Sequence, residues 1–552
     1  MNDFSVFLGG QAGEGIKRGA LTIGKLFNRL GYYVFILDDY MSLIRGGQDY
    51  SEIRISTSRV LSHKDTFDIV FAFHNDVYQA NKEKINQENN MIFVDGDKTY
   101  DFSFESLIKE AKAPSFMKPS ISLGILAYIH DISFEIIEEV LISEFHNNSP
   151  QNILLARKGY NLAYEKKIQK KPLQLREKIN LPLMYGNDAI AIGAVKAGMK
   201  FYFAYPITPS STLLSFLARN KHKFNISVIQ PEDEIAAIMM AIGSSYAGIP
   251  SMVGTSGAGI DLMGEAISLA GGTEIPLVVV DVQRPGPTTG VPTYTEQSDL
   301  NLALYVGHGE FPRIVVAPGD IDEALEITIK AFKYAWWYQT PVIILSDKHL
   351  SESATNIRAS LDFGSKEIIS FKAFDKGFNY KRYEITDDGV SPLAFPGFKN
   401  ITNHTNSTEH TEDGYSSSQP NDVKIMKEKR LKKLFTIEKD FTSEQMFKLY
   451  GNPQEKNLII SVGSTKGAII EAIKDLPAKF LQVISISPFP QQIKDLIEDS
   501  ENIICIEQNT FGQLASIFES KMHKKVNHRI LKYDGRPFNP NDLKENIKEL
   551  LI

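Results

Sequence analysis

The sequence predicts a multidomain α/β protein, and three observations lead to this prediction. The chain has 552 residues, 43% of them hydrophobic, which suffices for several cores and, at roughly 150 residues per domain, for three or four domains. Strand-like apolar segments alternate with segments of helical periodicity along most of the chain. In the middle, strands such as PLVVVDV and PVIILSD are almost continuously apolar, which is typical of a doubly wound parallel sheet covered on both faces.

The first α/β block spans residues 1–165. It opens with the strand FSVFLGG, passes through a glycine turn and continues into the helical pattern IKRGALTIGKLFNRLG. Further strands are expected at YYVFILD, SEIRIS, FDIVFAF and NMIFVDG. Residues 166–183 are basic and polar without an apolar period, so we expect a linker there.

The second block spans residues 184–360, with strands expected at KFYFAYP, SVIQP, SMVGT, PLVVVDVQ, RIVVAPG and PVIILSD. Residues 361–440 are rich in Gly, Pro, Asn, Ser and Thr and end in the basic run KIMKEKRLKKL. Such a polar segment cannot bury a core of its own, so we expect an extended crossover packed on other domains. Residues 441–552 return to alternating strands and helices and form a third α/β domain.

Composition excludes several classes of protein. Acidic residues outnumber basic ones, 67 to 60, and the two signs are interspersed, which does not favour nucleic acid or an anionic membrane as partner. The start MNDFSVFLGG lacks a basic and apolar signal segment, and no run approaches the roughly 18 apolar residues of a membrane span. A cytoplasmic protein is expected.

Cys505 is the only cysteine. An iron–sulfur cluster usually needs about four thiolates, so we expect none held by this chain alone. Cys505 lies in the apolar run IICIE, which favours a buried structural thiol.

The glycine turn at residues 9–15, GGQAGEG, lies between a strand and a helix, where backbone N–H groups could bind an anion. Asp38 and Asp39 follow at the next strand end, but the glycine spacing is not that of a dinucleotide fingerprint. Tight turn packing is therefore the preferred interpretation, ahead of a Rossmann dehydrogenase. Arg45 lies beside a glycine pair in LIRGGQ, a weak pattern on its own.

Two segments at expected strand ends carry polar groups suited to chemistry, since open α/β sheets bind ligands at that edge. Tyr205, Pro206, Ile207 and Thr208 begin YPITPSS, for which the residues alone favour a strand end followed by a helix cap. Glu232 lies in QPEDE, where acids at a helix start also serve the helix dipole. A carboxylate there could instead hold N1′ of a thiamine aminopyrimidine and activate the cofactor.

Two further strand ends complete the pattern. Thr255 and Ser256 open the small-residue turn TSGAG, which permits close approach of a ligand. Arg284 leaves the apolar strand PLVVV, where its guanidinium could bind a carboxylate in a bidentate manner or pair with a local acid.

Taken in order, YPITPSS, QPEDE, TSGAGIDLM, QRPGPTTG, PTYTEQSDL and GHGEFPRIVVAPG resemble the α subunit of 2-oxoacid:ferredoxin oxidoreductases. The N-terminal GGQAGEGI and SLIRGGQ resemble the γ domain of that family, fused ahead of the α part. RYEITDDGVSPLAFPG resembles the crossover of its 2-oxoglutarate or broad-specificity branch, and IEQNTFGQL resembles a motif of the transketolase C-terminal-like domain.

The resemblance implies a γ-type domain, a pyrimidine-binding domain for thiamine diphosphate and a transketolase C-terminal-like domain. It implies that Glu232 activates the cofactor, that Thr208 and Arg284 hold the substrate carboxylate, and that Arg45 reaches the substrate. The cofactor would also contact Tyr205, Pro206, Ile207, Thr255 and Ser256. The implied reaction converts pyruvate or 2-oxoglutarate and coenzyme A to acyl-CoA and CO2, and ferredoxin takes the electrons.

Part of the site is missing from the sequence. No G-D-G motif is followed by paired Asn, the usual ligands of the metal that binds the diphosphate. The resemblance assigns Mg²⁺ and a [4Fe–4S] cluster to a β subunit, so a heterodimer is expected. Ala12, Glu14 and Tyr294 depart from the family pattern, Tyr294 standing where a basic residue is common. An indolepyruvate-type enzyme and a non-catalytic scaffold remain as alternatives.

Overall fold

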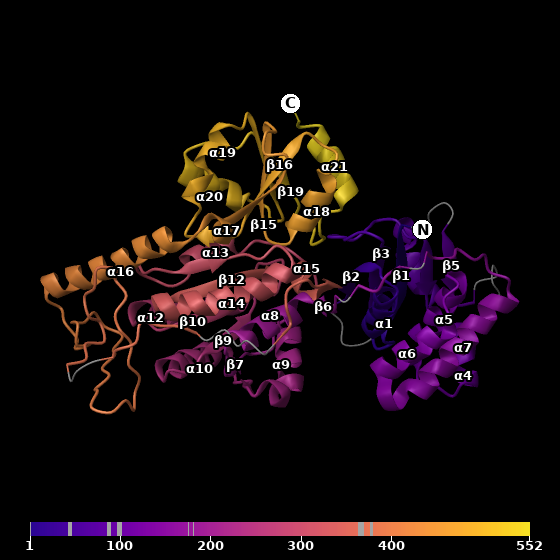
Figure 1. The fold of residues 1–552 in the computed structure, drawn as a ribbon, viewed down its shortest axis with the longest axis horizontal. Coiled ribbons are helices and arrows are strands. Elements are labelled where there is room, and N and C mark those ends of the chain that lie inside the picture. The colour runs from indigo at the N-terminus through magenta and orange to yellow at the C-terminus, as the bar shows by residue number, and fades with distance from the viewer. Residues whose placement is uncertain are drawn as a thin grey trace. The chain divides into compact units, whose positions relative to one another are not determined.

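The computed structural model describes residues 2–41, 47–85, 90–96, 102–174, 176–179, 181–362, 369–375 and 379–551. The chain forms two compact units (Figure 1). The N-terminal unit consists of Met1–Tyr185 and Glu352–Arg358, and the C-terminal unit consists of Gly186–Ser351 and Ala359–Ile552.

A seven-stranded mixed sheet forms the centre of the N-terminal unit, in the order β5-β4-β1-β3-β2-β13-β6. Its strands are β1 (Asp3–Gln11), β2 (Tyr33–Tyr40), β3 (Gln48–Ser56), β4 (Ile69–Ala72), β5 (Met91–Val94), β6 (Leu183–Tyr185) and β13 (Ser353–Asn356). Strands β1, β4 and β5 run parallel, and the remaining pairs are antiparallel. The strand expected at each of the five N-terminal apolar segments is present.

Strand β13 comes from far along the sequence and lies between β2 and β6. Asn356 Oδ1 accepts the backbone N–H of Val34 at 2.7 Å, and Thr355 Oγ1 donates to the Val34 carbonyl at 2.8 Å. The described residues of 166–182 contain no helix or strand. This segment is held against the unit by Tyr32, whose hydroxyl donates to the Gln174 carbonyl at 2.9 Å.

Seven helices of the N-terminal unit are described: α1 (Ile16–Arg29), α2 (Asn75–Ala80), α3 (Lys82–Ile85), α4 (Phe104–Glu110), α5 (Pro119–Ile129), α6 (Phe134–Phe145) and α7 (Ser149–Glu165). Every residue of α5 is buried. It packs on α7 through two glycines, since a Cβ on Gly124 would lie 1.8 Å from the Ala156 carbonyl oxygen and one on Gly159 would lie 2.2 Å from that of Ile121. Only residues without a side chain allow this backbone contact.

The C-terminal unit is built on a second seven-stranded sheet, in the order β17-β11-β12-β10-β9-β7-β8. Its strands are β7 (Phe201–Phe203), β8 (Ser227–Ile229), β9 (Ser251–Thr255), β10 (Leu277–Gln283), β11 (Ile314–Val316), β12 (Pro341–Asp347) and β17 (Ser485–Ser487). All pairs are parallel except β11 with β17. The parallel arrangement confirms the prediction from the continuous apolar strands.

Helices cover both faces of this sheet. They are α8 (Gly186–Lys196), α9 (Ser211–Phe224), α10 (Glu234–Tyr246), α11 (Gly257–Leu262), α12 (Gly264–Gly272), α13 (Leu300–Tyr305), α14 (Ile321–Tyr338) and α15 (Lys348–Glu352). Val279 points into the core shared with α10 and α12. Its neighbours Val278 and Val280 are equally buried and point to the other face, since side chains alternate along a strand.

Residues after 440 form a five-stranded sheet in the order β14-β16-β15-β18-β19. The elements are α17 (Ser443–Met446), β14 (Phe447–Gly451), β15 (Asn457–Val462), α18 (Thr465–Ala472), β16 (Ala478–Val483), α19 (Lys494–Glu498), β18 (Asn502–Glu507), α20 (Gln513–Met522), β19 (His528–Leu531) and α21 (Pro540–Lys548). The chain runs from β16 directly into β17, which joins the central sheet. Glu323 of α14 accepts from Lys466 at 2.6 Å and from Lys448 at 2.8 Å, which ties the two sheets together.

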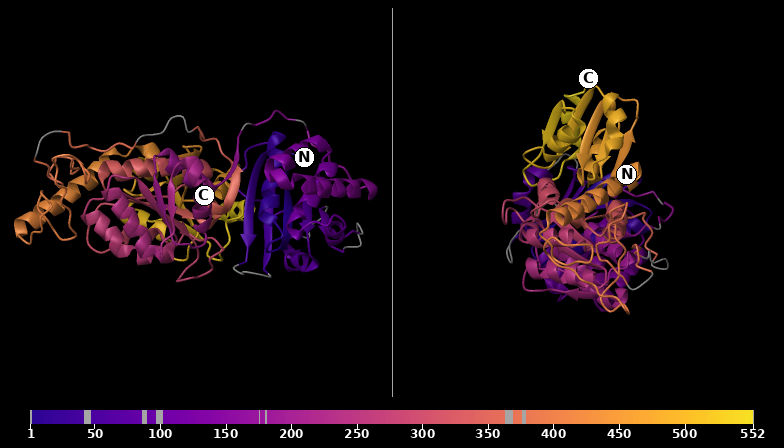
Figure 2. Two further views of the ribbon diagram at one scale, coloured as in Figure 1. Left: turned by 90° about the horizontal axis from the view of Figure 1, so that it is seen from below. Right: turned by 90° about the vertical axis from the view of Figure 1, so that its left-hand side faces the viewer.

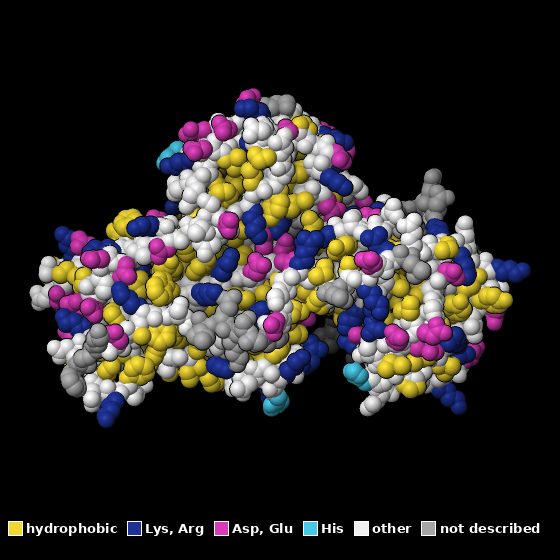
Figure 3. Space-filling view, viewed as in Figure 1, with side chains coloured by type: hydrophobic (Ala, Val, Ile, Leu, Met, Phe, Trp, Pro, Cys, Tyr) yellow, Lys and Arg dark blue, Asp and Glu magenta, His cyan; other side chains and the backbone are white. Residues whose placement is uncertain are grey.

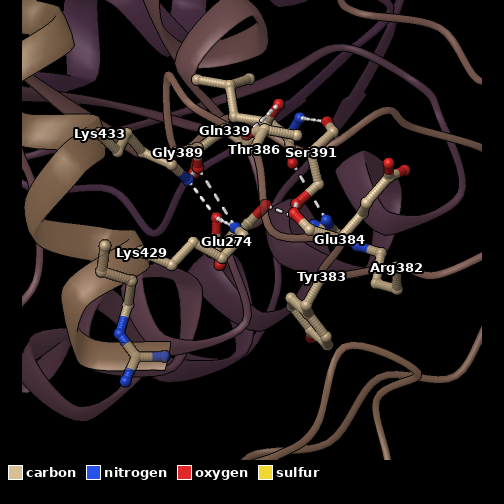
Figure 4. A network of polar contacts seen from close by, with 12 residues as sticks. Glu274, Gln339, Arg382, Tyr383, Glu384, Thr386, Gly389, Ser391, Lys429 and Lys433 are labelled. Atoms are coloured by element: carbon tan, nitrogen blue, oxygen red, sulfur yellow. Dashed lines mark hydrogen bonds and ion pairs between the residues drawn. The ribbon is translucent and has the colours of Figure 1, made fainter. Parts of the chain in front are cut away.

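The segment 361–440 differs from the prediction at its C-terminal end. The basic run expected to be extended lies in the 21-residue helix α16 (Pro420–Asp440). Figure 2 shows α16 and the loops before it grouped at one end of the C-terminal unit. Lys429 and Lys433, four residues apart on α16, both donate to the buried carboxylate of Glu274 (Figure 4). A buried acid thus stabilises the helix on the face that also buries Met426 and Ile437.

Cys505 is buried in β18, as the sequence predicts. Burial, together with the nearby Glu507, raises the pKa of its thiol well above the usual value. Among the residues that the structure describes, no helix combines the length and the apolar character needed to cross a membrane.

Candidate active site

The loops that carry the predicted site residues meet at one edge of the central sheet. Strands β8, β7, β9 and β10 are consecutive neighbours and run parallel. Their carboxyl ends therefore lie side by side, and the segments that begin at Tyr205, Glu232, Thr255 and Arg284 leave the sheet at the same edge. Open α/β sheets bind ligands at this edge.

Arg284 links two of these loops. Its Nη1 donates to the backbone carbonyl of Thr208 at 2.6 Å, so the residues expected to hold a carboxylate lie together. The guanidinium is half-buried, and burial lowers the pKa of Arg284, an effect that the charge of Asp299 opposes. The remaining N–H groups of a guanidinium can donate to a carboxylate as a planar pair.

The loop after β7 presents Tyr205 and Pro206 to solvent and half-buries Ile207 and Thr208. Asn187 at the start of α8 fixes the end of this loop. Its Nδ2 donates to the Pro209 carbonyl at 3.2 Å and to Thr212 Oγ1 at 2.7 Å. Asn187 therefore holds the C-terminal end of the loop, and the first residues of the loop stay accessible.

The three carboxylates of the acidic turn after β8 differ in exposure and in their partners. Glu232 is exposed. Asp233 caps α10, its side chain accepting the N–H of Ala236 at 2.8 Å, which satisfies a helix-start donor. Glu234 is only 7% exposed, and within the described part of the chain its carboxylate makes no hydrogen bond or ion pair.

Glu234 points toward the loop after β9. A Cβ built on Gly259 would lie 3.0 Å from Glu234 Cγ and 2.0 Å from Thr255 Oγ1. The sequence interpretation missed this residue. Its helical spacing with Ala237, Ile238 and Ala241, all buried on one face of α10, is the signal that could have found it.

The turn after β9 is buried and tightly packed. Thr255 and Ser256 are fully buried, and Ser256 Oγ lacks a hydrogen-bond partner among the residues that are described. Gly257 brings the chain against Asp299, because a Cβ there would lie 2.6 Å from Asp299 Oδ2. The buried, unpaired hydroxyl of Ser256, the unpaired carboxylate of Glu234 and the small-residue turn lie at one edge of the sheet. Together they fit a polar aromatic ligand such as an aminopyrimidine.

Tyr294 is contacted by the loop that follows β19. The guanidinium of Arg536 lies 3.6 Å from the centre of the Tyr294 ring. The neighbouring backbone is paired as well, since the N–H of Thr295 donates to the Gly535 carbonyl at 3.1 Å. The Tyr294 ring thus has a cation stacked on it from elsewhere in the chain.

Two of the quoted motifs meet near this point. The N–H of Gln297 donates to the Gln508 carbonyl at 2.7 Å, and Asn509 Nδ2 donates to the Gln297 carbonyl at 3.2 Å. The segment IEQNTFGQL therefore supports the loop PTYTEQSDL that follows Arg284.

The side chain of Glu14 fills the glycine turn of the N-terminal unit. Glu14 accepts the N–H of Gln11 at 2.9 Å and hydrogen bonds from His74 at 2.9 Å and from buried Lys118 at 2.6 Å. Burial alone would raise the pKa of Glu14, but these hydrogen bonds outweigh it and hold the pKa below its usual value. Asp38 is likewise engaged, by Ser51 Oγ at 2.6 Å. Tight turn packing is what the described residues form here.

Arg45 lies outside the described residues. Within those residues, no group of three or more His, Cys, Asp or Glu side chains is arranged to hold a metal ion.

Comparison with known proteins decides the family. Residues 192–429 match the family described as "Pyruvate flavodoxin/ferredoxin oxidoreductase, thiamine diP-bdg", and residues 5–162 match "Pyruvate ferredoxin/flavodoxin oxidoreductase". The 2-oxoacid:ferredoxin oxidoreductase subunit alpha of Sulfolobus sp is 32% identical over 99% of this chain and 96% of its own length. This chain belongs to the 2-oxoacid:ferredoxin oxidoreductase α subunits.

Other α subunits of this type are also similar. The 2-oxoglutarate synthase subunit KorA of Archaeoglobus fulgidus is 34% identical over 62% of this chain and 91% of its own length. A solved 2-oxoglutarate:ferredoxin oxidoreductase from Magnetococcus marinus, with 2-oxoglutarate, coenzyme A and succinyl-CoA bound, matches with a TM-score of 0.89 and 31% identity. That match covers 100% of this chain and 99% of the other. The predicted family and multidomain α/β fold are confirmed.

Proposed function

We propose that this α subunit forms a thiamine diphosphate site together with a β subunit, which supplies Mg²⁺ and a [4Fe–4S] cluster. The complete enzyme converts a 2-oxoacid and coenzyme A to acyl-CoA and CO2 and reduces ferredoxin. The pairing of Arg284 with the Thr208 backbone at the open edge of a thiamine-binding-type sheet carries this proposal. The cytoplasmic location expected from the sequence stays a prediction.

A partner surface beside the site supports the split arrangement. Large apolar side chains are exposed on the loops and helices around the acidic turn: Tyr205, Ile229, Ile235, Met239, Met240 and Leu262, at 36–52%. Figure 3 shows hydrophobic side chains gathered over the region of α10 and α12. Apolar side chains grouped in this way are typical of a protein interface. We propose that the β subunit covers them and closes the site.

Each site residue has a proposed task. Arg284 and Thr208 hold the carboxylate of the 2-oxoacid, and Arg45 is a further candidate for substrate contact. The cofactor lies against Tyr205, Pro206, Ile207, Thr255 and Ser256, and when bound it supplies the carbon nucleophile and the electron sink. This chain orients the substrate and, once covered by its partner, excludes water.

The activating carboxylate has two candidates. Glu232 is the one predicted from the sequence, and it stays a prediction. Glu234 is the one that burial favours, because a carboxylate that is only 7% exposed and has no partner in the described structure can accept a hydrogen bond from the aminopyrimidine.

The first experiment is co-purification with a cysteine-containing β chain, followed by viologen reduction with pyruvate, 2-oxobutyrate and 2-oxoglutarate, with and without coenzyme A. Activity that needs both chains and coenzyme A supports the proposal and ranks the substrates. A stable complex without any 2-oxoacid-dependent reduction contradicts it and favours the scaffold.

Glu234→Gln and Glu232→Gln form a matched pair for the cofactor role. We expect the Glu234 variant to lose about 100-fold or more in kcat, the lower range for a general acid–base group, and the Glu232 variant to stay within about threefold. Binding of thiamine diphosphate, followed by circular dichroism, checks that neither variant has lost the site. The reverse order of losses would return the role to Glu232.

A further inference from the structure

Two acids behind Arg284 have no role in the proposed function. Asp281, near the end of β10, is 1% exposed, and neither of its carboxylate oxygens has a hydrogen-bond partner in the described residues. Asp299, directly before α13, is half-buried, and its Oδ2 also lacks a described partner. Burying unpaired carboxylates is unfavourable while they are charged.

Like charges surround the two acids. The carboxylate of Asp299 lies against the backbone of Gly257 at the start of α11. Asp261, on the same short helix, acts electrostatically on both Asp281 and Asp299, and Glu296 acts on Asp299. Arg284 is the cation that opposes them. A buried and a half-buried carboxyl among further acids disfavour each other's ionisation.

The protonation states follow from this arrangement. Burial, then the charges of Asp299 and Asp261, raise the pKa of Asp281 well above its usual value. Burial, then Asp261 and Glu296, raise the pKa of Asp299 to about 7, although Arg284 opposes the shift. Burial and like charge therefore favour the protonated form of Asp281, whereas Asp299 changes charge near neutral pH.

Asp299 is tied to Arg284 by position. Its backbone N–H donates to Gln283 Oε1 at 3.1 Å, and Gln283 directly precedes Arg284. The charges of Asp299 and Arg284 act on each other, yet the two side chains form no salt bridge in the described structure. The guanidinium thus lies between the Thr208 backbone and an acid that can take on charge.

We propose that Asp299 is a positioning residue whose carboxylate competes with the substrate carboxylate for Arg284. This inference rests on the proposed role of Arg284. When Asp299 is protonated, the guanidinium of Arg284 is available to bind the carboxylate of the 2-oxoacid. With Asp299 ionised, the guanidinium is drawn toward it and binds the substrate less tightly.

The test is the pH dependence of KM and kcat in the complete αβ complex. In the wild type, KM for the 2-oxoacid should rise roughly fivefold between pH 6 and pH 8, the lower range for coupling between two sites, with little change in kcat. Asp299→Asn, which keeps the shape, should have a low KM that no longer depends on pH. Asp261→Asn should move the rise to lower pH, and Asp281→Asn should leave it in place.

Two further measurements keep the inference independent of turnover. Calorimetric binding of oxamate, an unreactive 2-oxoacid analogue, to the complex should follow the same pH pattern as KM. The infrared band of a protonated carboxyl should be lost from the isolated chain in Asp281→Asn at pH 8, and the exposed Asp387→Asn serves as control.

The outcomes separate this inference from the proposed function. An unchanged rise of KM in Asp299→Asn overturns the inference while the enzyme stays active. Loss of all 2-oxoacid-dependent activity overturns the proposed function, and oxamate binding and the infrared band then still decide the charge states. A flat KM in the wild type also overturns the inference.

Discussion

Glu274 and Asp281 are both buried acids of the C-terminal unit, but only Glu274 is surrounded by cations. Glu274 accepts from Lys429 at 2.8 Å and from Lys433, and Arg382 donates to its backbone carbonyl at 2.6 Å (Figure 4). Burial would raise the pKa of Glu274, but Lys429, Lys433 and Arg382 lower it far below the usual value. Asp281 has no such partners, and its pKa is raised.

The two acids show that the partner decides the protonation state, since both side chains are removed from water to a similar degree. Glu274 binds Lys429 of α16, which also donates to the Gly389 carbonyl, so the charge of Glu274 serves the fold. Asp281 lies at the strand-end edge beside Arg284, where an unsatisfied group is retained. Perturbed acids without a structural partner are concentrated at functional sites.

The largest loss of stability is expected from breaking the buried cluster of Glu274, Lys429 and Lys433. Glu274→Gln leaves Lys429 and Lys433 buried without a counter-ion, and removing one partner of a buried pair costs about 3–5 kcal/mol. The midpoint of urea unfolding, followed by circular dichroism, measures this loss. Glu326→Gln, on an exposed position of α14, is the control and should leave the midpoint unchanged. A variant as stable as the wild type would contradict the structural role of Glu274.

A smaller loss is expected when one of the two lysines is removed. In Lys433→Met, Glu274 keeps Lys429, and the apolar side chain fills the same space. Because burial, partly offset by Glu274, lowers the pKa of Lys433 to about 7, the lost hydrogen bond is only partly charge-assisted. We expect destabilisation of about 1.5–3 kcal/mol, measured in the same urea series. A loss equal to that of Glu274→Gln would mean that both lysines are indispensable.

The acids differ in the direction of their pH dependence. The stabilising contribution of Glu274, whose pKa is lowered, is present above its ordinary pKa of 4.5 and is lost as the pH falls. The pKa of Asp299 is raised from 3.8 to about 7. The contribution of Asp299 to stability is therefore fully present below pH 3.8 and is lost as the pH rises to about 7.

Asp299→Asn should therefore stabilise the chain more at pH 8 than at pH 5, by about 1–2 kcal/mol. Thermal unfolding of variant and wild type at both pH values measures the difference. A gain that does not depend on pH would show that Asp299 keeps one charge state throughout.

The smallest effect is expected for Asp281→Asn. Because burial and the charges of Asp299 and Asp261 favour the protonated form of Asp281, an amide of the same shape should change the unfolding free energy by less than about 1 kcal/mol between pH 5 and pH 8. The contrast with Glu274→Gln sharpens the comparison, because the same chemical change is made in two equally buried acids. Strong stabilisation at high pH would instead reveal a charged Asp281.

Much of the site could be predicted from the sequence because its motifs follow successive apolar strands. Thr208 and Arg284 each follow an apolar strand, so parallel pairing alone brings them to one edge. Glu234 was missed because three adjacent acids do not reveal which one faces inward. Helix α16 was missed because its buried lysines depend on Glu274, far away in the sequence. The charge of Asp299 depends on burial and on Asp261, which no local pattern contains.

The position of β13 has a consequence for synthesis of the chain. The N-terminal sheet needs residues 353–356 between β2 and β6, and these leave the ribosome only after the whole central sheet as far as β12 has been made. Until then β2 is an open edge strand, and such edges can pair with other chains. A fragment that stops at residue 185 would keep this edge, so the two units cannot be separated by a single cut without leaving one sheet incomplete.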